Sequence, residues 1–420
     1  MLTVDGDRLW ERLMEMAQIG GTSQGGVCRV ALTNEDRDGR NLFVRWCADI
    51  GCTVEVDQMG NIFARRPGEN NDAPAIMIGS HLDSQPTGGK FDGVLGVLAG
   101  FEVLETLNDH AISTSVPIEL VSWTNEEGAR FSPAMIASGV FSGNFTLDYA
   151  YSRTDKQGRT LGGELDRIGY KGALKVGDRP YRATFELHIE QGPILEAEQK
   201  SVGIVTGVQG IRWYDLTLTG QETHAGPSPM RYRRDPMMLA SKILPLVYGI
   251  AETYQPEARV TIGYIDAMPG VRNTVPGSLT IAIDLRHPDA ETLANMDSDL
   301  KGIVRELNGE HEVATELEEV WHSPPVKFAS ECVDAVRNAT EICQVSAKEI
   351  VSGAGHDAVN IAKVAPTSMI FIPCKDGLSH NEQESIKQED AIHGANVLLN
   401  AVLQIASSNK VSEGIISSNA

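Results

Sequence analysis

Four short stretches of the chain place histidine and carboxylate side chains where a predicted strand runs into a loop. Open α/β sheets bind their ligands at such junctions. Each stretch also has a glycine or a buried apolar run beside its polar residues. The stretches contain His81 with Asp83 and Asp92, Glu126 with Glu127, His188, and His380.

Mixed carboxylates and imidazoles are suitable ligands for Zn²⁺, Mn²⁺ or Co²⁺. Two such ions about 3.5–4 Å apart need a carboxylate between them and further ligands on each side. Asp92 as the bridge, with His81 and His188 on one ion and Glu127 and His380 on the other, meets this requirement. A lone histidine at a strand end is usually structural, so the prediction depends on the four stretches together.

The adjacent acids Glu126 and Glu127 follow the apolar run PIELVSW, which would deliver them to the edge of a sheet. One of them can bind metal while the other acts as a general base toward water. Asp83 lies two residues from His81 and is expected to accept the hydrogen bond of the second ring N–H of that ligand. The alternative for the adjacent acids Glu126 and Glu127 is that they lie on a solvated face and have no role in a site.

Alternating strands and helices are expected to position these residues. Amphipathic patterns predict helices over residues 9–18, 41–49 and 91–107, the last opened by Asp92. Apolar runs predict strands from Cys52, Asn61, Ala75 and Pro117, and TSMIFIPC predicts a buried strand before His380. This alternation favours an α/β fold with a mixed sheet and helices on both faces.

The pattern changes near Gly210. WYDLTLTG, ARVTIGYID and SLTIAIDLRHP alternate apolar and polar residues, as in sheets with one solvated face, and two helical stretches lie between and after them. We therefore expect a discontinuous catalytic domain, residues 1–209 and 325–420, and an inserted α+β domain, residues 210–324. The polar tail from Ser407 is expected to fray.

The composition excludes several classes of protein. The 420 residues carry a net charge of −21, which argues against binding to nucleic acid or to an anionic membrane. No apolar stretch is long enough for a transmembrane helix, and the first residues do not resemble a secretory signal. The six cysteines form no CxxC pair. These features favour a cytoplasmic protein.

Together the motifs resemble the hydantoinase/carbamoylase branch of the dinuclear-metal M20 amidohydrolases. The resemblance is carried, in order along nearly the whole chain, by GSHLDSQPTGGKFDGVLGVLAG, TNEEGARF, ELHIEQGPILE, THAGPSPMRYRRD, NTVPG, DLRHP, SGAGHD and GLSHNE. It implies a homodimer formed through the inserted domain, which also serves as a lid. It also implies two divalent ions, Zn²⁺ first and Mn²⁺, Co²⁺ or Ni²⁺ as alternatives.

The resemblance extends to the roles of individual residues. It implies the metal ligands named above, with Glu126 as the base, and related peptidases carry a carboxylate where this chain has His188. It implies that His224 stabilises the oxyanion and that Arg286 binds the substrate carboxylate. Further substrate contacts are expected from Asn273, Gln191 and Arg212. His356 and Asp357 in SGAGHD are expected in a flexible loop beside the site, not as ligands.

The function expected is hydrolysis of N-carbamoyl-L-amino acids or N-carbamoyl-β-alanine to the amino acid, CO₂ and ammonia. The alternatives are an allantoate amidohydrolase and, further off, an M20 metallopeptidase or aminoacylase. A protein with a degenerate metal site and no enzyme activity is a fourth alternative. The substrate is expected to be a small carboxylate. Dimerisation through the inserted domain would allow His224 to act in the partner's site, so we expect catalysis in trans.

Overall fold

The computed structural model describes residues 2–407, and the chain divides into two compact units. The first combines Met1–Thr206 with Phe328–Ala420, and the second is Gly207–Lys327. The tail predicted to fray lies outside the described residues, except for Ser407. None of the helices within residues 2–407 has the length and apolar character needed to cross a bilayer.

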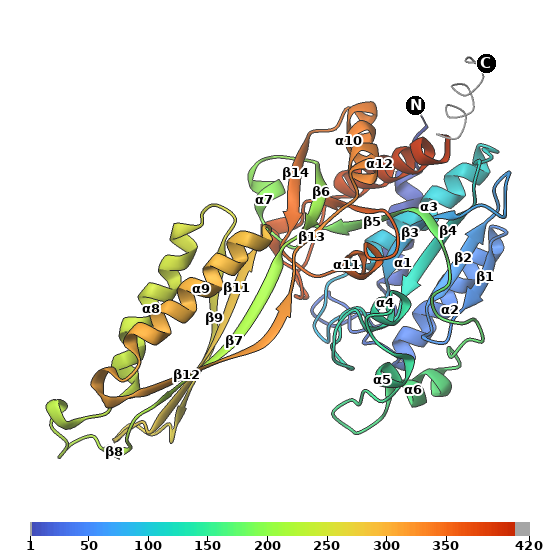
Figure 1. The fold of residues 1–420 in the computed structure, drawn as a ribbon. Coiled ribbons are helices and arrows are strands. Elements are labelled where there is room, and N and C mark those ends of the chain that lie inside the picture. Colours follow the sequence, from blue (N-terminus) through green and yellow to red (C-terminus); the bar gives the residue numbers. More distant parts are fainter. Residues whose placement is uncertain (1, 408–420) are drawn as a thin grey trace, which may run out of the picture. The chain divides into compact units, whose positions relative to one another are not determined.

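The first unit is built on a nine-stranded mixed sheet (Figure 1). In order across the sheet, its strands are β1 (Thr53–Val56), β2 (Ile62–Arg66), β4 (Ile118–Trp123), β3 (Ala75–His81), β5 (Tyr181–Ile189), β15 (Thr367–Ile372), β6 (Val202–Val208) and β13 (Val326–Lys327), and β14 (Ala347–Ser352) pairs with β6. The central strands β4, β3, β5 and β15 are parallel to their neighbours in this group. The outer pairs of the main path are antiparallel.

Helices cover both faces of this sheet, as predicted. Every residue of β3, β4 and β15 is buried, because these strands have packed neighbours above and below. One face is covered by α3 (Val94–Asp109), α10 (Ser330–Cys343) and α12 (Gln388–Ser407), and α1 (Gly6–Met16) packs on α3 and α12. On the other face, α4 (Ile136–Phe141) and α11 (Asp357–Ile361) contribute Phe141 and Ile361 to a core with Met77 and Trp123. The remaining helices are α2 (Asn34–Asp49), α5 (Leu147–Tyr151), α6 (Leu161–Ile168), α7 (Ile194–Ala197) and the 3₁₀ turn η3 (Lys375–Gly377).

Two of the predicted helices begin earlier than their apolar pattern does. Helix α1 starts at Gly6 because the Asp5 side chain caps it by accepting the Arg8 N–H. Helix α2 starts at Asn34, after the capping residue Thr33. Its first half, NEDRDGR, is polar and gives no apolar period, so only the second half could be predicted.

The prediction that Asp92 opens the third helix is wrong. Helix α3 starts at Val94 after Gly93, which has φ +68° and ψ −46°, and no side chain caps it. The Asp92 carbonyl accepts the Val94 N–H at 2.8 Å, so the chain makes a tight three-residue turn at Gly93. This turn leaves the Asp92 carboxylate free for contacts outside the helix.

The second unit is a four-stranded antiparallel sheet with helices on one face (Figure 1). In order its strands are β12 (Ala314–Ser323), β7 (Gly210–Thr219), β11 (Ser278–His287) and β9 (Arg259–Met268). Its helices α8 (Pro236–Thr253) and α9 (Ala290–Leu307) pack on the apolar residues of alternate positions, such as Leu216, Ile281 and Leu285. Smaller elements are the pair β8 (Thr223–His224) and β10 (Thr274–Val275), and the 3₁₀ turns η1 (Met230–Tyr232) and η2 (Glu310–Glu312).

Strand β12 was not predicted from the sequence. It is an edge strand in which most residues are exposed and the middle of the strand carries three glutamates, so its composition resembles a solvated loop. Only its register shows why it is a strand, because Leu317 pairs with Leu216 of β7 over the core.

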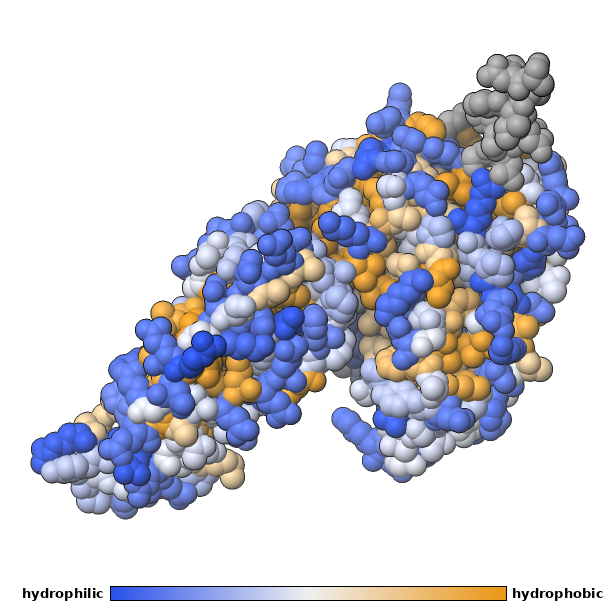
Figure 2. All heavy atoms as spheres, in the orientation of Figure 1, coloured by the Kyte–Doolittle hydropathy of each residue, from blue (hydrophilic) through white to orange (hydrophobic). Residues whose placement is uncertain are grey.

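On the face drawn in Figure 2, hydrophilic residues predominate on the outward surface of α8 and α9.

Candidate active site

The parallel strands of the first unit bring the four predicted stretches to one edge of the sheet. His81 ends β3 and His188 lies near the end of β5. Glu127 lies in the loop after β4, and His380 in the loop after β15. These four strands are neighbours, in the order β4-β3-β5-β15. Since parallel strands end at the same edge, side chains that are up to about 300 residues apart in sequence meet there.

Asp92 lies at the centre of this cluster. Its Oδ1 is 3.1 Å from Nε2 of His188 and 3.7 Å from Nε2 of His81. Its Oδ2 is 3.5 Å from Nε2 of His380, and that nitrogen is 3.3 Å from Oε2 of Glu127. The carboxylate of Asp92 is therefore shared by two donor groups, one on each oxygen.

The ring orientations of His81 and His188 are suited to metal binding. Nδ1 of His81 is 2.9 Å from the carbonyl oxygen of Asp83, and Nδ1 of His188 is 2.9 Å from the carbonyl oxygen of Ile189. These contacts fix each ring with Nε2 directed toward Asp92. Imidazole nitrogens and carboxylate oxygens gathered in this way are the donor set that Zn²⁺, Mn²⁺ and Co²⁺ prefer.

A third group of possible ligands, made of Glu186, His188 and His356, is already satisfied within the protein. Glu186 Oε1 accepts the Ser80 hydroxyl at 2.6 Å, and Oε2 accepts the Ala358 N–H at 3.2 Å. We therefore interpret this group as support for His188, not as a further cation site.

The charged groups of the cluster shift one another's pKa values. Burial opposes ionisation of Asp92, but its hydrogen bond and charge interaction with His188 hold the pKa of Asp92 well below its usual range. The same contacts overcome burial and raise the pKa of His188 to about 9. The hydrogen bond to Glu127 raises the pKa of His380 to about 9. Divalent cations would displace these protons on binding.

Asp83 accepts the hydrogen bond of the His81 ring, as predicted, but through its main chain and not through its carboxylate. Its main-chain carbonyl accepts from His81, and its carboxylate Oδ1 is 3.9 Å from that ring nitrogen. The carboxylate instead accepts the main-chain N–H groups of Glu126 at 3.2 Å and Glu127 at 3.3 Å. Burial raises the pKa of Asp83 to about 6. Asp83 therefore supports the acid pair as well as the His81 ring.

Glu126 lies inside the cluster without taking part in either donor group. Its Oε2 is 3.6 Å from Nε2 of His81, and its side chain is buried. Burial raises the pKa of Glu126 well above its usual range, and the nearby charges of Asp357, Glu127 and Asp83 raise it further. A carboxylate in these surroundings is suited to accept and release a proton.

Gln191 is also part of this cluster. Its amide Nε2 donates to Oδ2 of Asp92 at 2.8 Å and to the Ser379 hydroxyl at 3.2 Å. Its Oε1 is buried with no hydrogen-bond partner among the described residues. The side chain therefore presents an unused acceptor beside Asp92.

The expectation of a flexible loop at His356 and Asp357 is wrong. Both residues are buried, and Asp357 begins α11. Nε2 of His356 is 3.1 Å from the Ser352 hydroxyl, and its ring lies edge-on to His188 with centroids 4.6 Å apart. The Ser138 hydroxyl donates to Asp357. A Cβ atom on Gly355 would lie 2.9 Å from Cε of Met135, so this segment is closely packed, and the residues do lie beside the cluster.

In the second unit, the structure brings His224 and Asn273 together. His224 in β8 pairs with Thr274 of β10, and the carbonyl of Asn273 accepts the Ala225 N–H at 2.8 Å. Nδ1 of His224 accepts the Gly226 N–H at 3.1 Å, which leaves Nε2 available. Both side chains are exposed.

The side chains of Arg286 and Arg212 project from opposite faces of the four-stranded sheet. Arg286 lies on the open face, where its Nε and Nη2 donate to the Asp284 carboxylate at 3.0 and 2.7 Å. Arg212 lies on the helix-covered face, where Nη1 is 3.4 Å from Asp297 of α9 and 3.2 Å from Glu319. These contacts favour a structural role for Arg212 over the predicted contact with substrate.

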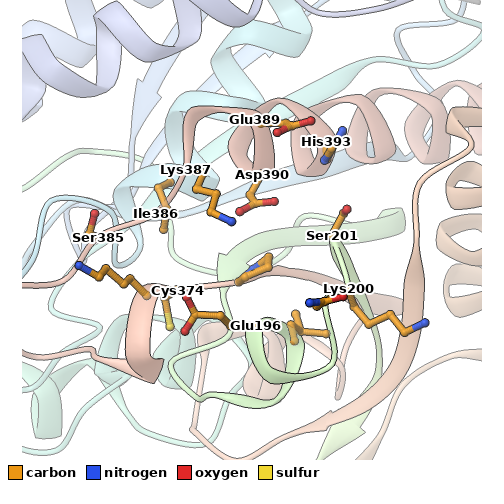
Figure 3. A pocket seen from close by; sticks show the side chains of 14 residues that line it. Glu196, Lys200, Ser201, Cys374, Ser385, Ile386, Lys387, Glu389, Asp390 and His393 are labelled. Carbon is orange, nitrogen blue, oxygen red and sulfur yellow. The ribbon is translucent and has the colours of Figure 1, made fainter.

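A separate cavity of about 520 Å³ lies where the chain leaves β15 and enters α12 (Figure 3). Its polar lining includes Glu196, Lys387, Asp390 and His393, and burial raises the pKa of Asp390. None of the predicted site residues is among the described residues that line it.

Two residues beside Asp92, Ser379 and Glu384, were not predicted from the sequence. Ser379 donates to the Asp92 carboxylate, and Glu384 accepts the Asp92 main-chain N–H. Neither their spacing nor their type distinguishes them from the exposed polar residues around them.

Comparison with known proteins agrees with this geometry. Residues 77–404 match the model of peptidase family M20/M25/M40. An N-carbamoyl-L-amino-acid amidohydrolase of Rhizobium meliloti is 49% identical over 96% of this chain and 97% of its own length. An allantoate amidohydrolase of Bacillus subtilis is 32% identical, covering 93% and 95%. A hydantoinase/carbamoylase family amidase from Burkholderia multivorans is 55% identical in sequence with a TM-score of 0.94, covering 96% and 98%.

Proposed function

The chain belongs to peptidase family M20/M25/M40, and we propose that it hydrolyses N-carbamoyl-L-amino acids to the amino acid, CO₂ and ammonia. Relatives named N-carbamoyl-L-amino-acid amidohydrolase support a hydrolase of C–N bonds other than peptide bonds. The observation that carries the proposal is Asp92, whose two oxygens face separate donor groups while Glu126 beside them stays free.

We assign two divalent ions to the cluster, Zn²⁺ first and Mn²⁺, Co²⁺ or Ni²⁺ as alternatives. His81 and His188 would hold one ion, Glu127 and His380 the other, and Asp92 would bridge them. When bound, the ions polarise the attacked carbonyl and lower the pKa of water. The buried pair of His81 and His188 predicts a tighter position, and the pair of Glu127 with the half-exposed His380 predicts a weaker one.

Glu126 is assigned the proton transfers. It accepts a proton from the attacking water and delivers it to the nitrogen that leaves as the amino group of the product. Its buried position beside Asp357 and Asp83 raises the pKa of Glu126, which makes its carboxylate a stronger base toward the proton of the attacking water. Gln191, with its free Oε1 beside Asp92, is assigned to hydrogen-bond the carbamoyl NH₂ group.

Residues of the second unit are assigned to the substrate. Nε2 of His224 would donate to the oxyanion of the tetrahedral intermediate, with Asn273 beside it as a further donor. Arg286 would bind the substrate carboxylate through its planar fork. Its present partner, Asp284, then keeps the guanidinium oriented.

We further propose a homodimer formed through the second unit. This unit exposes large apolar side chains that a single copy leaves uncovered, and exposed apolar patches mark interaction surfaces. They include Trp213, Tyr264, Ile265, Met268, Val320 and Trp321. A measured mass of two chains in solution would support this assignment.

The substrate class can be tested with one panel on metal-reconstituted enzyme. Ammonia release would be compared for N-carbamoyl-L-amino acids, N-carbamoyl-β-alanine and allantoate, and amine release for dipeptides. We expect the highest kcat/KM with an N-carbamoyl-L-amino acid. The Glu126→Gln variant serves as the background control. A higher kcat/KM with allantoate would establish the second candidate, which the relative from Bacillus subtilis supports.

A further inference from the structure

Glu384 is a buried carboxylate beside the cluster that has no part in the proposed mechanism. It lies in the loop between His380 and α12, and only 4% of it is exposed. Its Oε1 accepts two successive main-chain N–H groups, from Phe91 at 3.0 Å and from Asp92 at 3.1 Å. Two such bonds on one oxygen, both of good length, hold the carboxylate against this segment of main chain.

The second oxygen of Glu384 reaches the cluster through a serine. The hydroxyl of Ser379 donates to Oδ2 of Asp92 at 2.8 Å and lies 3.2 Å from Oε2 of Glu384. Ser379 directly precedes His380 in the chain. Glu384 is thus connected to the main chain of Asp92, to its side chain, and to the residue that precedes the neighbouring histidine.

The two loops are packed so closely that one of them requires a glycine. A Cβ atom on Gly89 would lie 2.1 Å from Oε1 of Glu384. Any larger residue at this position would push the carboxylate away from Phe91 and Asp92. The contact therefore depends on residues 89 and 384 together, although they are far apart in sequence.

We propose that Glu384 is a positioning residue that holds Asp92 and His380 in register with each other. It does so without contacting the substrate or the ions, and the role rests on the ion pair of the proposed function. His380 needs such support because its side chain is 52% exposed, in contrast to the buried His81 and His188. Loss of Glu384 should therefore affect the Glu127 and His380 position more than the buried one.

The test is a metal titration of the full-length enzyme, stripped and reloaded with Co²⁺ and followed by its visible absorption and by metal analysis. Wild type should take up two equivalents. Glu384→Ala should weaken the second equivalent about 10–100-fold, the usual effect of losing a group that orients a ligand, and leave the first nearly unchanged. Glu384→Gln keeps an acceptor oxygen for the two N–H groups, so it should restore most of this affinity.

Glu382→Gln is the matched control, because Glu382 is in the same loop but accepts from the Thr22 hydroxyl, away from Asp92. It should bind both ions as wild type does. If Glu384→Ala fails to fold, Ser379→Ala carries the same test, since it breaks the link to Asp92 Oδ2. The positioning role is overturned if wild type binds two ions and the folded Glu384 or Ser379 variant binds them equally well. A wild type that binds fewer than two ions would overturn the proposed ion pair as well.

Discussion

Glu126 and Glu127 are neighbours in the chain but have different surroundings. Both main-chain N–H groups are held by the Asp83 carboxylate, which fixes the pair at the end of β4. Oε2 of Glu127 then meets His380, whereas Glu126 faces His81 and its carboxylate accepts no hydrogen bond from a described residue. Two adjacent acids can therefore divide the work of binding an ion and moving a proton.

Glu126→Gln should lower kcat by about 10²–10⁴, the usual weight of a general base. The amide has nearly the same shape, so both ions should still bind, as shown by metal analysis of the purified variant. Glu127→Gln should instead lose one ion. Near-normal kcat in Glu126→Gln, or loss of metal from it, would contradict the assignment.

Arg286→Lys should raise KM for carboxylate substrates by roughly tenfold, because lysine keeps the charge but lacks the planar two-donor fork. Steady-state kinetics with an N-carbamoyl-L-amino acid would measure the change. Arg212→Lys provides the comparison on the opposite face of the sheet. Since Arg212 contacts Asp297 and Glu319, its substitution should lower Tm and leave KM nearly unchanged. The reverse pattern would place the carboxylate contact at Arg212.

At the scale of elements, the sequence predicts strand ends better than it predicts side-chain partners. The apolar runs before His81 and Glu126 identify β3 and β4, because buried parallel strands are apolar on both faces. Strand β12 and the first half of α2 escape prediction because solvated polar residues dominate them. Their positions depend on long-range pairing that a local pattern does not contain.

The contacts of the candidate site show the same limit. Residue types were enough to group His81, Asp92, His188 and His380. They were not enough to show that Asp83 uses its carbonyl toward His81, since that depends on how the loop after β3 turns. Nor could spacing reveal Glu384, because the main-chain N–H groups that it accepts lie almost 300 residues earlier in the chain.

The turn at Gly93 links an element boundary to the site, and Gly93→Ala should disturb both. A Cβ atom at this position would lie 2.3 Å from the His81 ring, and φ is +68°. We expect the free energy of unfolding to fall by about 1–3 kcal/mol, the usual cost of such backbone strain, together with weaker binding of the first ion. Urea unfolding and metal titration would measure the two effects.

Gly143→Ala separates strain from the ring contact. Gly143 also has a positive φ, +81°, but a Cβ atom added there would have no described atom within 4 Å apart from those of its chain neighbours. This variant should lose stability from backbone strain alone and bind metal normally. If both variants bind metal equally well, the space beside His81 is not the reason for glycine at position 93.

At the scale of the whole molecule, the proposed chemistry draws on two units with separate cores. The first unit holds the cluster around Asp92, and the second holds His224 and Arg286. A substrate that contacts residues of both units would need them to come together around it. If the second unit also forms the dimer, one active site can take its residues from two chains.

We therefore predict catalysis in trans, which subunit exchange would test. His224→Ala and Glu126→Gln should each be nearly inactive alone, because one lacks the donor to the oxyanion and the other lacks the base. In a mixed dimer, one site would combine an intact Glu126 from one chain with an intact His224 from its partner, so activity should recover to an appreciable fraction of wild type. If native mass measurement confirms mixed dimers and they stay inactive, His224 acts within its own chain, and the dimer then has no role in assembling the site.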